Sequence, residues 1–248
     1  MSQKEEFSGL NSHETSIEGR YTKKIALIIG NSTYTNGGSL TNPVNDARAM
    51  QNLLDKLGFE VIKLENVSLD QFKKAVDNFG RKLQDYEVSL FYYAGHGIQF
   101  QGSNYLIPTD ANLTDEHQIE FDCLSADRIL RFMEFSNCKV KIMILDACRN
   151  NPFERSWRRS VDGQGLTFMN APTGTLIAYA TSPGSTADDG NNGKGLYTES
   201  LLRHMITPNL SIEQVFKRVR AEVETKSGKR QTPWESTSLK GEFCFVCN

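Results

Sequence analysis

Two stretches decide the fold of this chain: VSLFYYAGHG at residues 88–97 and VKIMILDACR at residues 140–149. Each begins with a mostly apolar run, which is typical of a strand buried on both faces of a parallel sheet. Each ends in small and polar residues, one with a histidine and the other with a cysteine. Ligand sites of such sheets lie beyond the carboxyl ends of the strands, so we expect these two endings to meet at a site.

Further strands and helices alternate around these stretches. The strand-like runs are residues 25–29, 59–64, 88–94, 140–145 and 175–180, and 243–246 could add a last edge strand. Apolar residues at helical spacing mark residues 44–57, 69–83, 126–135, 195–205 and 211–225. Ile98–Phe100 and Tyr105–Ile107 flank a Gln101-Gly102 turn, which predicts a small hairpin. This alternation predicts an α/β fold: a mostly parallel, doubly wound sheet of about six strands with helices on both faces.

Composition narrows the class of protein. A chain of 248 residues with 38% hydrophobic and 23% charged residues can bury one sizeable core. The formal net charge of −2 gives no basic excess for general nucleic-acid binding. No apolar run reaches the roughly 18 residues of a membrane span, and the polar first twenty residues lack a signal-peptide core. We therefore expect a cytoplasmic protein with a flexible arm at 1–20 and one domain at 21–248. Five cysteines do not indicate a disulfide framework.

A cysteine beside a histidine is a pattern for nucleophilic catalysis. Taken alone, His96 would be interpreted as a loop histidine and Cys148 as a buried thiol. If their strands are neighbours, about 5 Å apart, the thiol can transfer its proton to the imidazole and become a thiolate. The backbone N–H groups of Gly97 and Cys148 are candidate oxyanion donors, and Gly97 permits close approach because it has no Cβ.

The motifs around these residues resemble those of caspase-like cysteine peptidases. A caspase signature is Q-A-C-[RQG]-G with a histidine about 50 residues upstream, and here DACRN occupies 146–150 with His96 lying 52 residues before Cys148. Five further motifs are similar to those of the bacterial metacaspase and paracaspase-like branch: ALIIGN (26–31), LTNPVNDA (40–47), YYAGHG (92–97), YLIP (105–108) and YATSPG (179–184). The resemblance covers about residues 22–246 and implies a three-layer caspase-like sandwich.

The chain has Asp146 where the caspase signature has Gln, and this departure concerns substrate specificity. Caspases cut after aspartate, whereas metacaspases and paracaspases cut after Arg or Lys through an acidic pocket. Asp146 lies two residues before Cys148, so on a strand both side chains face the same side. The family pattern implies that Asp46 belongs to the same pocket; alone, Asp46 would be interpreted as a helix N-terminal charge. Asp188 or Asp189 is a candidate third acid, with a solvated turn as the alternative.

The segment 149–172 is too long for a simple connection and carries Arg155, Arg158 and Arg159. Related peptidases are often activated by cutting or rearranging the segment after the catalytic cysteine. These arginines are therefore candidate self-cleavage sites, the alternative being a basic solvated loop. A regulatory protein partner is a second possible control.

No metal or other cofactor is expected. Cys244 and Cys247 form a single C-x-x-C without a second pair, which argues against zinc. Five acids between residues 110 and 122 could bind calcium as in metacaspases, although their spacing is not that of an EF-hand. These acids are Asp110, Asp115, Glu116, Glu120 and Asp122.

The leading hypothesis is a cysteine endopeptidase that cleaves proteins after Arg or Lys. Cys148 is its nucleophile, His96 its base and then acid, and Asp46 with Asp146 selects the basic side chain. One alternative is a catalytically silent caspase-like module for assembly or regulation, although both catalytic residue types are present. Another is a flavodoxin-like binding domain, which no phosphate-binding loop supports.

Overall fold

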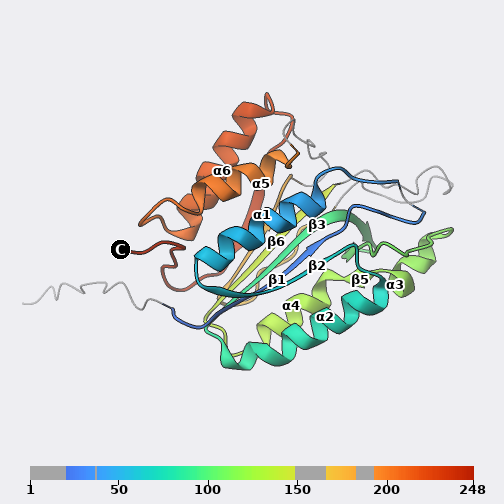
Figure 1. Ribbon diagram of the computed structural model, residues 1–248, viewed down its shortest axis with the longest axis horizontal. Helices are drawn as coiled ribbons and strands as arrows, with labels where there is room; N and C mark the ends of the chain where they lie inside the picture. The colour runs from blue at the N-terminus through green and yellow to red at the C-terminus, as the bar shows by residue number, and fades with distance from the viewer. Residues whose placement is uncertain (1–20, 37, 149–165, 183–192) are drawn as a thin grey trace, which may run out of the picture.

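The central feature of the computed structural model, which describes residues 21–36, 38–148, 166–182 and 193–248, is a six-stranded sheet (Figure 1). Its strand order is β2-β1-β3-β6-β7-β8. The first five strands in this order are parallel, and β8 runs antiparallel to β7. The strands are β1 (Lys24–Gly30), β2 (Phe59–Glu65), β3 (Val88–Phe100), β6 (Val140–Cys148), β7 (Thr175–Tyr179) and β8 (Trp234–Thr237).

Helices cover both faces of the sheet and complete a three-layer sandwich (Figure 1). On one face lie α1 (Pro43–Lys56), α5 (Leu196–His204) and α6 (Ile212–Lys226). On the other face lie α2 (Leu69–Lys82) and α4 (Ala126–Glu134). Side chains alternate along each strand, so Ile28 and Tyr92 pack toward α1 while Ile29 and Tyr93 pack toward α2. Both faces of the sheet are therefore core, as the apolar strand runs predict.

A smaller sheet grows from the far end of β3. It contains β4 (Ser103–Leu106) and β5 (Leu124–Ser125). The remaining short elements are the helix α3 (Ile119–Asp122), which directly precedes β5, and two 3-10 turns at Leu83–Asp85 and Glu116–Gln118. Positive φ angles at Gln101 (48°) and Gly102 (80°) match the two-residue turn that joins strands with right-handed twist. The predicted hairpin is confirmed, with Phe100 opposite Ser103.

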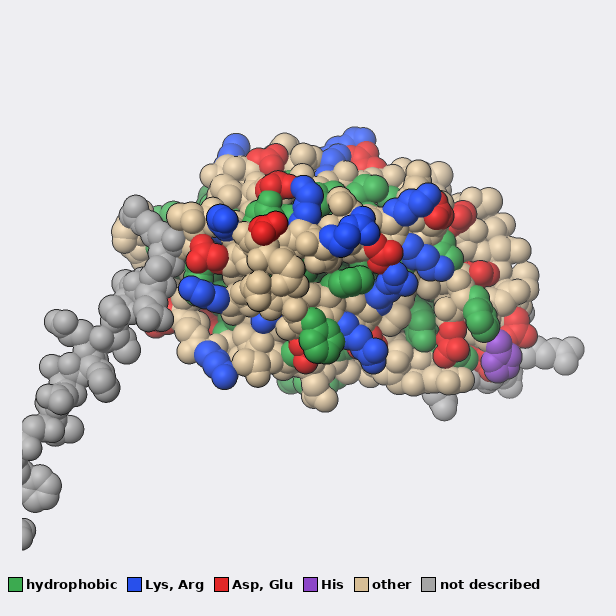
Figure 2. All heavy atoms as spheres, turned by 90° about the horizontal axis from the view of Figure 1, so that it is seen from below, with side chains coloured by type: hydrophobic (Ala, Val, Ile, Leu, Met, Phe, Trp, Pro, Cys, Tyr) green, Lys and Arg blue, Asp and Glu red, His purple; other side chains and the backbone are tan. Residues whose placement is uncertain are grey.

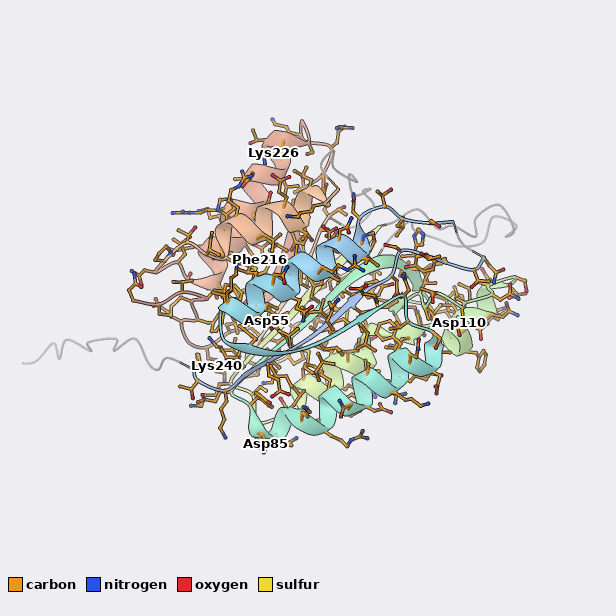
Figure 3. The ribbon with its side chains drawn as sticks, in the orientation of Figure 1. Asp55, Asp85, Asp110, Phe216, Lys226 and Lys240 are labelled. Atoms are coloured by element: carbon orange, nitrogen blue, oxygen red, sulfur yellow. A yellow bond between two sulfur atoms is a disulfide. The ribbon has the colours of Figure 1, made fainter. Side chains whose placement is uncertain are left out.

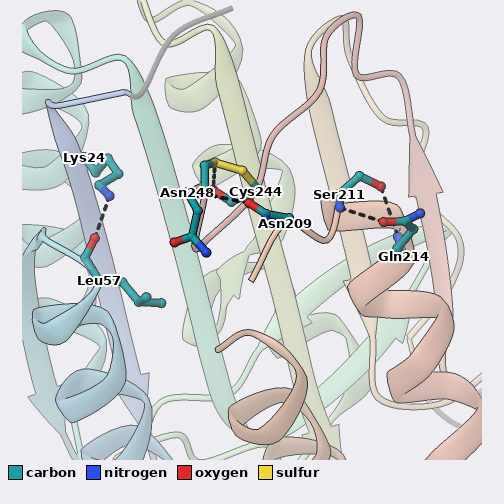
Figure 4. The surroundings of a disulfide bond; sticks show 8 residues. Lys24, Leu57, Asn209, Ser211, Gln214, Cys244 and Asn248 are labelled. Atoms are coloured by element: carbon teal, nitrogen blue, oxygen red, sulfur yellow. Dashed lines mark hydrogen bonds between the residues drawn. A yellow bond between two sulfur atoms is a disulfide. The ribbon is translucent and has the colours of Figure 1, made fainter. Parts of the chain in front are cut away.

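Local sequence explains where the helices begin. Ser68 caps α2: its Oγ accepts from the backbone N–H of Gln71, whose side chain in turn accepts from the Ser68 N–H. Ser211 and Gln214 form the same capping box at α6, which is drawn in Figure 4. Pro43 stands at the first position of α1, where no N–H is needed.

The surface of the α2 and α4 layer mixes cationic and anionic side chains (Figure 2). Ion pairs join Lys74 to Asp70 at 2.6 Å and Arg128 to Asp77 at 2.6 Å. Exposed pairs of this kind contribute little to the free energy of unfolding. These pairs therefore add charge of both signs to the surface without contributing much to the stability of the layer.

Three expectations from the sequence are corrected. The strand with His96 does not stop before it, because β3 continues to Phe100 and enters the hairpin. Residues 243–246 form no strand; Phe243 and Phe245 are buried and pack edge to face at 5.1 Å instead. The edge strand is β8, whose polar residues pair with β7 on one side. The C-terminal cysteines, Cys244 and Cys247, are joined in a disulfide (Figure 4).

Candidate active site

His96 and Cys148 occupy paired positions on neighbouring strands. They are the last partners in the parallel ladder of β3 and β6, which runs from Val88 opposite Val140 to this pair. Neighbouring strands are about 4.8 Å apart, so the two backbones are held side by side. The predicted adjacency of these residues is confirmed at the level of the backbone.

The imidazole of His96 is buried and packs against Tyr34. Its ring centroid lies 4.6 Å from that of Tyr34, with the planes tilted by 52°. Burial lowers the pKa of His96 to about 4, while the backbone of Gly38 acts weakly in the opposite direction. That backbone contact falls outside hydrogen-bonding geometry, and neither ring nitrogen has a hydrogen-bond partner among the described residues. At neutral pH the ring is therefore uncharged and able to accept a proton.

Gly97 packs where no larger residue fits. A Cβ added there would lie 3.0 Å from the Cβ of Ala147 and 3.0 Å from Cδ2 of Leu166. Ala147 immediately precedes Cys148 on β6, so the glycine allows β3 to pack closely against β6 and Leu166. The role of Gly97 as an oxyanion donor stays a prediction.

The two predicted specificity acids lie together at the same end of the sheet. Both side-chain oxygens of Asp46, in the first turn of α1, accept from the backbone N–H of Gly195 at 3.1 Å. Oδ2 of Asp146 on β6 accepts from the Thr198 hydroxyl at 2.7 Å. A Cβ on Gly195 would lie 3.1 Å from Oδ2 of Asp46 and 3.6 Å from Oδ2 of Asp146. Glycine at 195 therefore lets α5 approach both carboxylates.

The surroundings of this acid pair favour negative charge. Asp46 is 2% exposed and Asp146 is 8% exposed, so water screens them weakly. The N-terminal ends of α1 and α5 both lie at the pair, and the partial positive charge of a helix N-terminus stabilises anions. Burial, followed by the charges of Asp146 and Asp46, raises the pKa of Tyr92 well above its usual value. Two carboxylates buried this close together give this end of the sheet a negative charge, as the sequence-based hypothesis of an acidic pocket expects.

The remaining predicted residues fall outside the described part of the chain. These are Asp188 and Asp189 as the third acid, and the candidate self-cleavage residues Arg155, Arg158 and Arg159. The sequence analysis missed Tyr34, Gly195 and Thr198, which the structure brings to the site. No local motif marks them, because each is more than 50 residues from its partner in the site.

Within the ranges that the structure describes, no group of three or more His, Cys, Asp or Glu side chains could hold a metal ion. Two of the acids considered for calcium accept hydrogen bonds from backbone N–H groups. Oδ1 of Asp110 accepts from the Leu69 N–H at 2.8 Å at the start of α2, and Oδ1 of Asp115 accepts from the His117 N–H at 2.7 Å. Figure 3 shows Asp110 at this end of the molecule, beside the beginning of α2. Among the described helices, none is long and apolar enough to cross a membrane.

Comparisons with known proteins agree with this architecture. The family model of the caspase domain matches residues 23–244. The human mucosa-associated lymphoid tissue lymphoma translocation protein 1 is 32% identical over 179 residues, covering 71% of this chain and 20% of the relative. Dog caspase-12 is 26% identical over 243 residues, covering 87% of this chain and 60% of the relative. The chain thus spans about a fifth of the human relative's length.

Solved structures show the same fold. The Drosophila initiator caspase Dronc superposes with a TM-score of 0.68 at 16% identity, covering 100% of this chain and 94% of the other. Caspase-1 from Spodoptera frugiperda gives 0.67 at 17% identity, covering 91% and 90%. The parallel sheet, its helical layers and the family match lead to one conclusion: this chain belongs to the caspase domain family.

Proposed function

We propose that this protein is a cysteine endopeptidase that cleaves protein substrates after Arg or Lys. The observation that carries the proposal is the buried acid pair, Asp46 and Asp146, at the strand end that bears Cys148. Cys148 and Asp146 are two residues apart on β6, and positions two apart on a strand share a face, so we expect the thiol on the side of the sheet that bears Asp146. A substrate residue that enters the acid pair therefore places its own carbonyl near the thiol.

The reaction begins with transfer of the Cys148 proton to neutral His96. The thiolate attacks the carbonyl carbon of the scissile bond, and the backbone N–H groups of Gly97 and Cys148 donate to the oxyanion that forms. The C–N bond breaks as protonated His96 gives its proton to the leaving amine. A water molecule, deprotonated by His96, then attacks the thioester, which releases the new carboxyl end and restores the thiol.

Specificity follows from the charge and the geometry of the acid pair. An aspartate side chain in the substrate would bring a third carboxylate to a buried site, which is electrostatically costly. A guanidinium donates several hydrogen bonds in a planar fork and suits two carboxylates better than an ammonium does. We therefore propose Arg as the preferred residue, followed by Lys.

Control of the enzyme is proposed at the segment after the nucleophile, either by self-cleavage at one of its arginines or by a protein partner. The family model matches the caspase domain, and the chain spans only a fifth of the human relative. The substrate and the partner of the whole protein are therefore proposed and not taken from the relative.

The test is hydrolysis of fluorogenic peptides that end in Arg, Lys or Asp before the reporter. We expect turnover of the Arg and Lys peptides by the unmutated protein and none by Cys148→Ala or His96→Ala. Both variants should remain folded at the assay temperature, which circular dichroism checks. Turnover of more than about one per cent by pure Cys148→Ala would exclude this nucleophile. A folded parent protein without activity on any peptide, alone or after limited proteolysis, would favour the silent regulatory module.

A further inference from the structure

We propose that Tyr34 and Tyr93 are positioning residues that clamp the peptide unit of His96 and thereby hold its imidazole beside Cys148. The inference deepens the proposed function and rests on it, because it assumes that His96 is the base. Neither tyrosine is expected to touch the substrate.

The clamp grips His96 at both of its backbone groups. The His96 N–H donates to Oη of Tyr34 at 2.8 Å. On the other side, Oη of Tyr93 donates to the His96 carbonyl oxygen at 2.7 Å, and the Ile107 N–H donates to the same oxygen at 3.0 Å. Each bond is buried, so none is weakened by competing water.

Both tyrosines are themselves anchored in different layers of the fold. The ring of Tyr93 is fully buried and stacks on Phe72 of α2, with centroids 5.9 Å apart and planes 13° apart. Tyr34 comes from the segment after β1, and the next residue, Thr35, donates its N–H to the Thr109 carbonyl at 2.8 Å. The clamp thus ties His96 to the α2 layer and to the neighbouring loop.

Gly95 is the residue that makes room for the clamp. A Cβ at this position would lie 2.7 Å from the hydroxyl of Tyr34 and 2.7 Å from that of Tyr93. Both hydroxyls therefore converge on the backbone immediately before His96. The hydroxyls of Tyr34 and Tyr93 therefore explain why the YYAGHG stretch has glycine at position 95.

The clamp matters because, within the described ranges, no hydrogen bond fixes the imidazole itself. Neither ring nitrogen has a hydrogen-bond partner among the described residues, so the orientation of the ring depends on its backbone and on packing against Tyr34. A displacement of about 1 Å between a catalytic base and its proton donor costs on the order of 100-fold in rate. Loss of one hydroxyl should therefore slow proton transfer without changing substrate binding.

The experiment compares Tyr34→Phe and Tyr93→Phe with Tyr105→Phe as the matched control. Tyr105 is also buried, but its hydroxyl lies beside Glu120 and not beside His96. Two readouts are used: kcat and KM on an Arg peptide, and the rate at which iodoacetamide alkylates Cys148 at pH 7, located by peptide mass spectrometry. The second readout needs no substrate pocket. His96→Ala gives the alkylation rate of Cys148 in the absence of the proposed base.

We expect each of the two Phe variants to lose about tenfold in kcat and in alkylation rate, with KM within twofold, while Tyr105→Phe matches the parent. Parent-like alkylation and kcat in both Phe variants, together with a slow His96→Ala, would overturn the clamp and leave the dyad intact. A His96→Ala rate equal to that of the parent would instead refute the proposed function. Should Tyr93→Phe unfold, Tyr34→Phe decides alone, because it keeps the aromatic ring and removes one buried oxygen.

Discussion

His96 and Cys148 face each other as register partners, although 52 positions separate them in the chain. The pairing belongs to the backbone of two central strands. The proposed base and the proposed nucleophile are therefore placed by the same ladder that builds the core.

The acid pair predicts how charge removal changes selectivity. Asp146→Asn and Asp46→Asn keep the shape of the pair but remove one charge each, so we expect kcat/KM for an Arg peptide to fall at least tenfold in each variant. Asp70→Asn, at an exposed acid on α2, should match the parent. Steady-state kinetics on Arg, Lys and Asp peptides checks this, and a parent enzyme that prefers the Asp peptide would refute the pocket.

A larger residue at position 195 should also lower kcat/KM for Arg peptides, by a steric effect on the acid pair. Its added Cβ would lie 3.1 Å from Oδ2 of Asp46, closer than nearly all real contacts of a Cβ, so Gly195→Ala must displace α5 or the carboxylate. We expect kcat/KM for Arg peptides to fall about tenfold, with the alkylation rate of Cys148 unchanged. An equal loss in both measurements would place Gly195 in the folding of the site and not in its selectivity.

The buried histidine makes the stability of the fold depend on pH. The pKa of His96 is lowered from 6.5 to about 4 by burial, so between these values the unfolded state binds the extra proton and unfolding is favoured as the pH falls. From pH 7 to pH 5 this destabilises the fold by about 2 kcal/mol. Urea unfolding of Cys148→Ala measures it, and adding His96→Gln should remove that part of the pH dependence. An unchanged slope would mean that water reaches the ring.

Self-cleavage is predicted in the segment after Cys148. Arg155, Arg158 and Arg159 are of the residue type that the acid pair should accept, so concentrated active protein should yield fragments that end at one of them. Cys148→Ala should stay whole under the same conditions. Intact-mass spectrometry of both proteins decides the matter: an unbroken chain in a fully active preparation leaves ordering by a partner as the route to activation.

Local pattern carried most of the secondary structure. Apolar runs placed β1, β2, β3, β6 and β7, and helical spacing placed the five long helices, because both faces of the sheet and one face of each helix must be buried. The edge strand was misplaced, because Trp-Glu-Ser-Thr at 234–237 lacks an apolar run while Phe243 and Phe245 belong to the core without being a strand. An edge strand needs only one hydrogen-bonded neighbour and little apolar surface.

The candidate site was predictable from the apolar runs that lead into it and from the family resemblance. Asp146 and Cys148 lie at the end of β6, whereas His96 follows the apolar run of β3 without ending that strand, which continues to Phe100. Asp46 came from the family resemblance. Tyr34, Gly195 and Thr198 reach the site through helix and loop packing, which leaves no periodic trace in the sequence. For these three residues, tertiary packing and not local sequence determines that they belong to the site.

The continuation of β3 through His96 bears on how the enzyme would lose activity. A histidine on a loose connection can leave its place by local fluctuation, at small cost in free energy. Here the His96 N–H is bonded to the buried hydroxyl of Tyr34 and its carbonyl oxygen to Tyr93 and Ile107. The residue lies between its register partner on β6 and the hairpin with β4, so moving it requires these bonds and the strand pairing around them to open together. Amide hydrogen exchange at His96 should be among the slowest in the molecule, and heat inactivation should coincide with global unfolding.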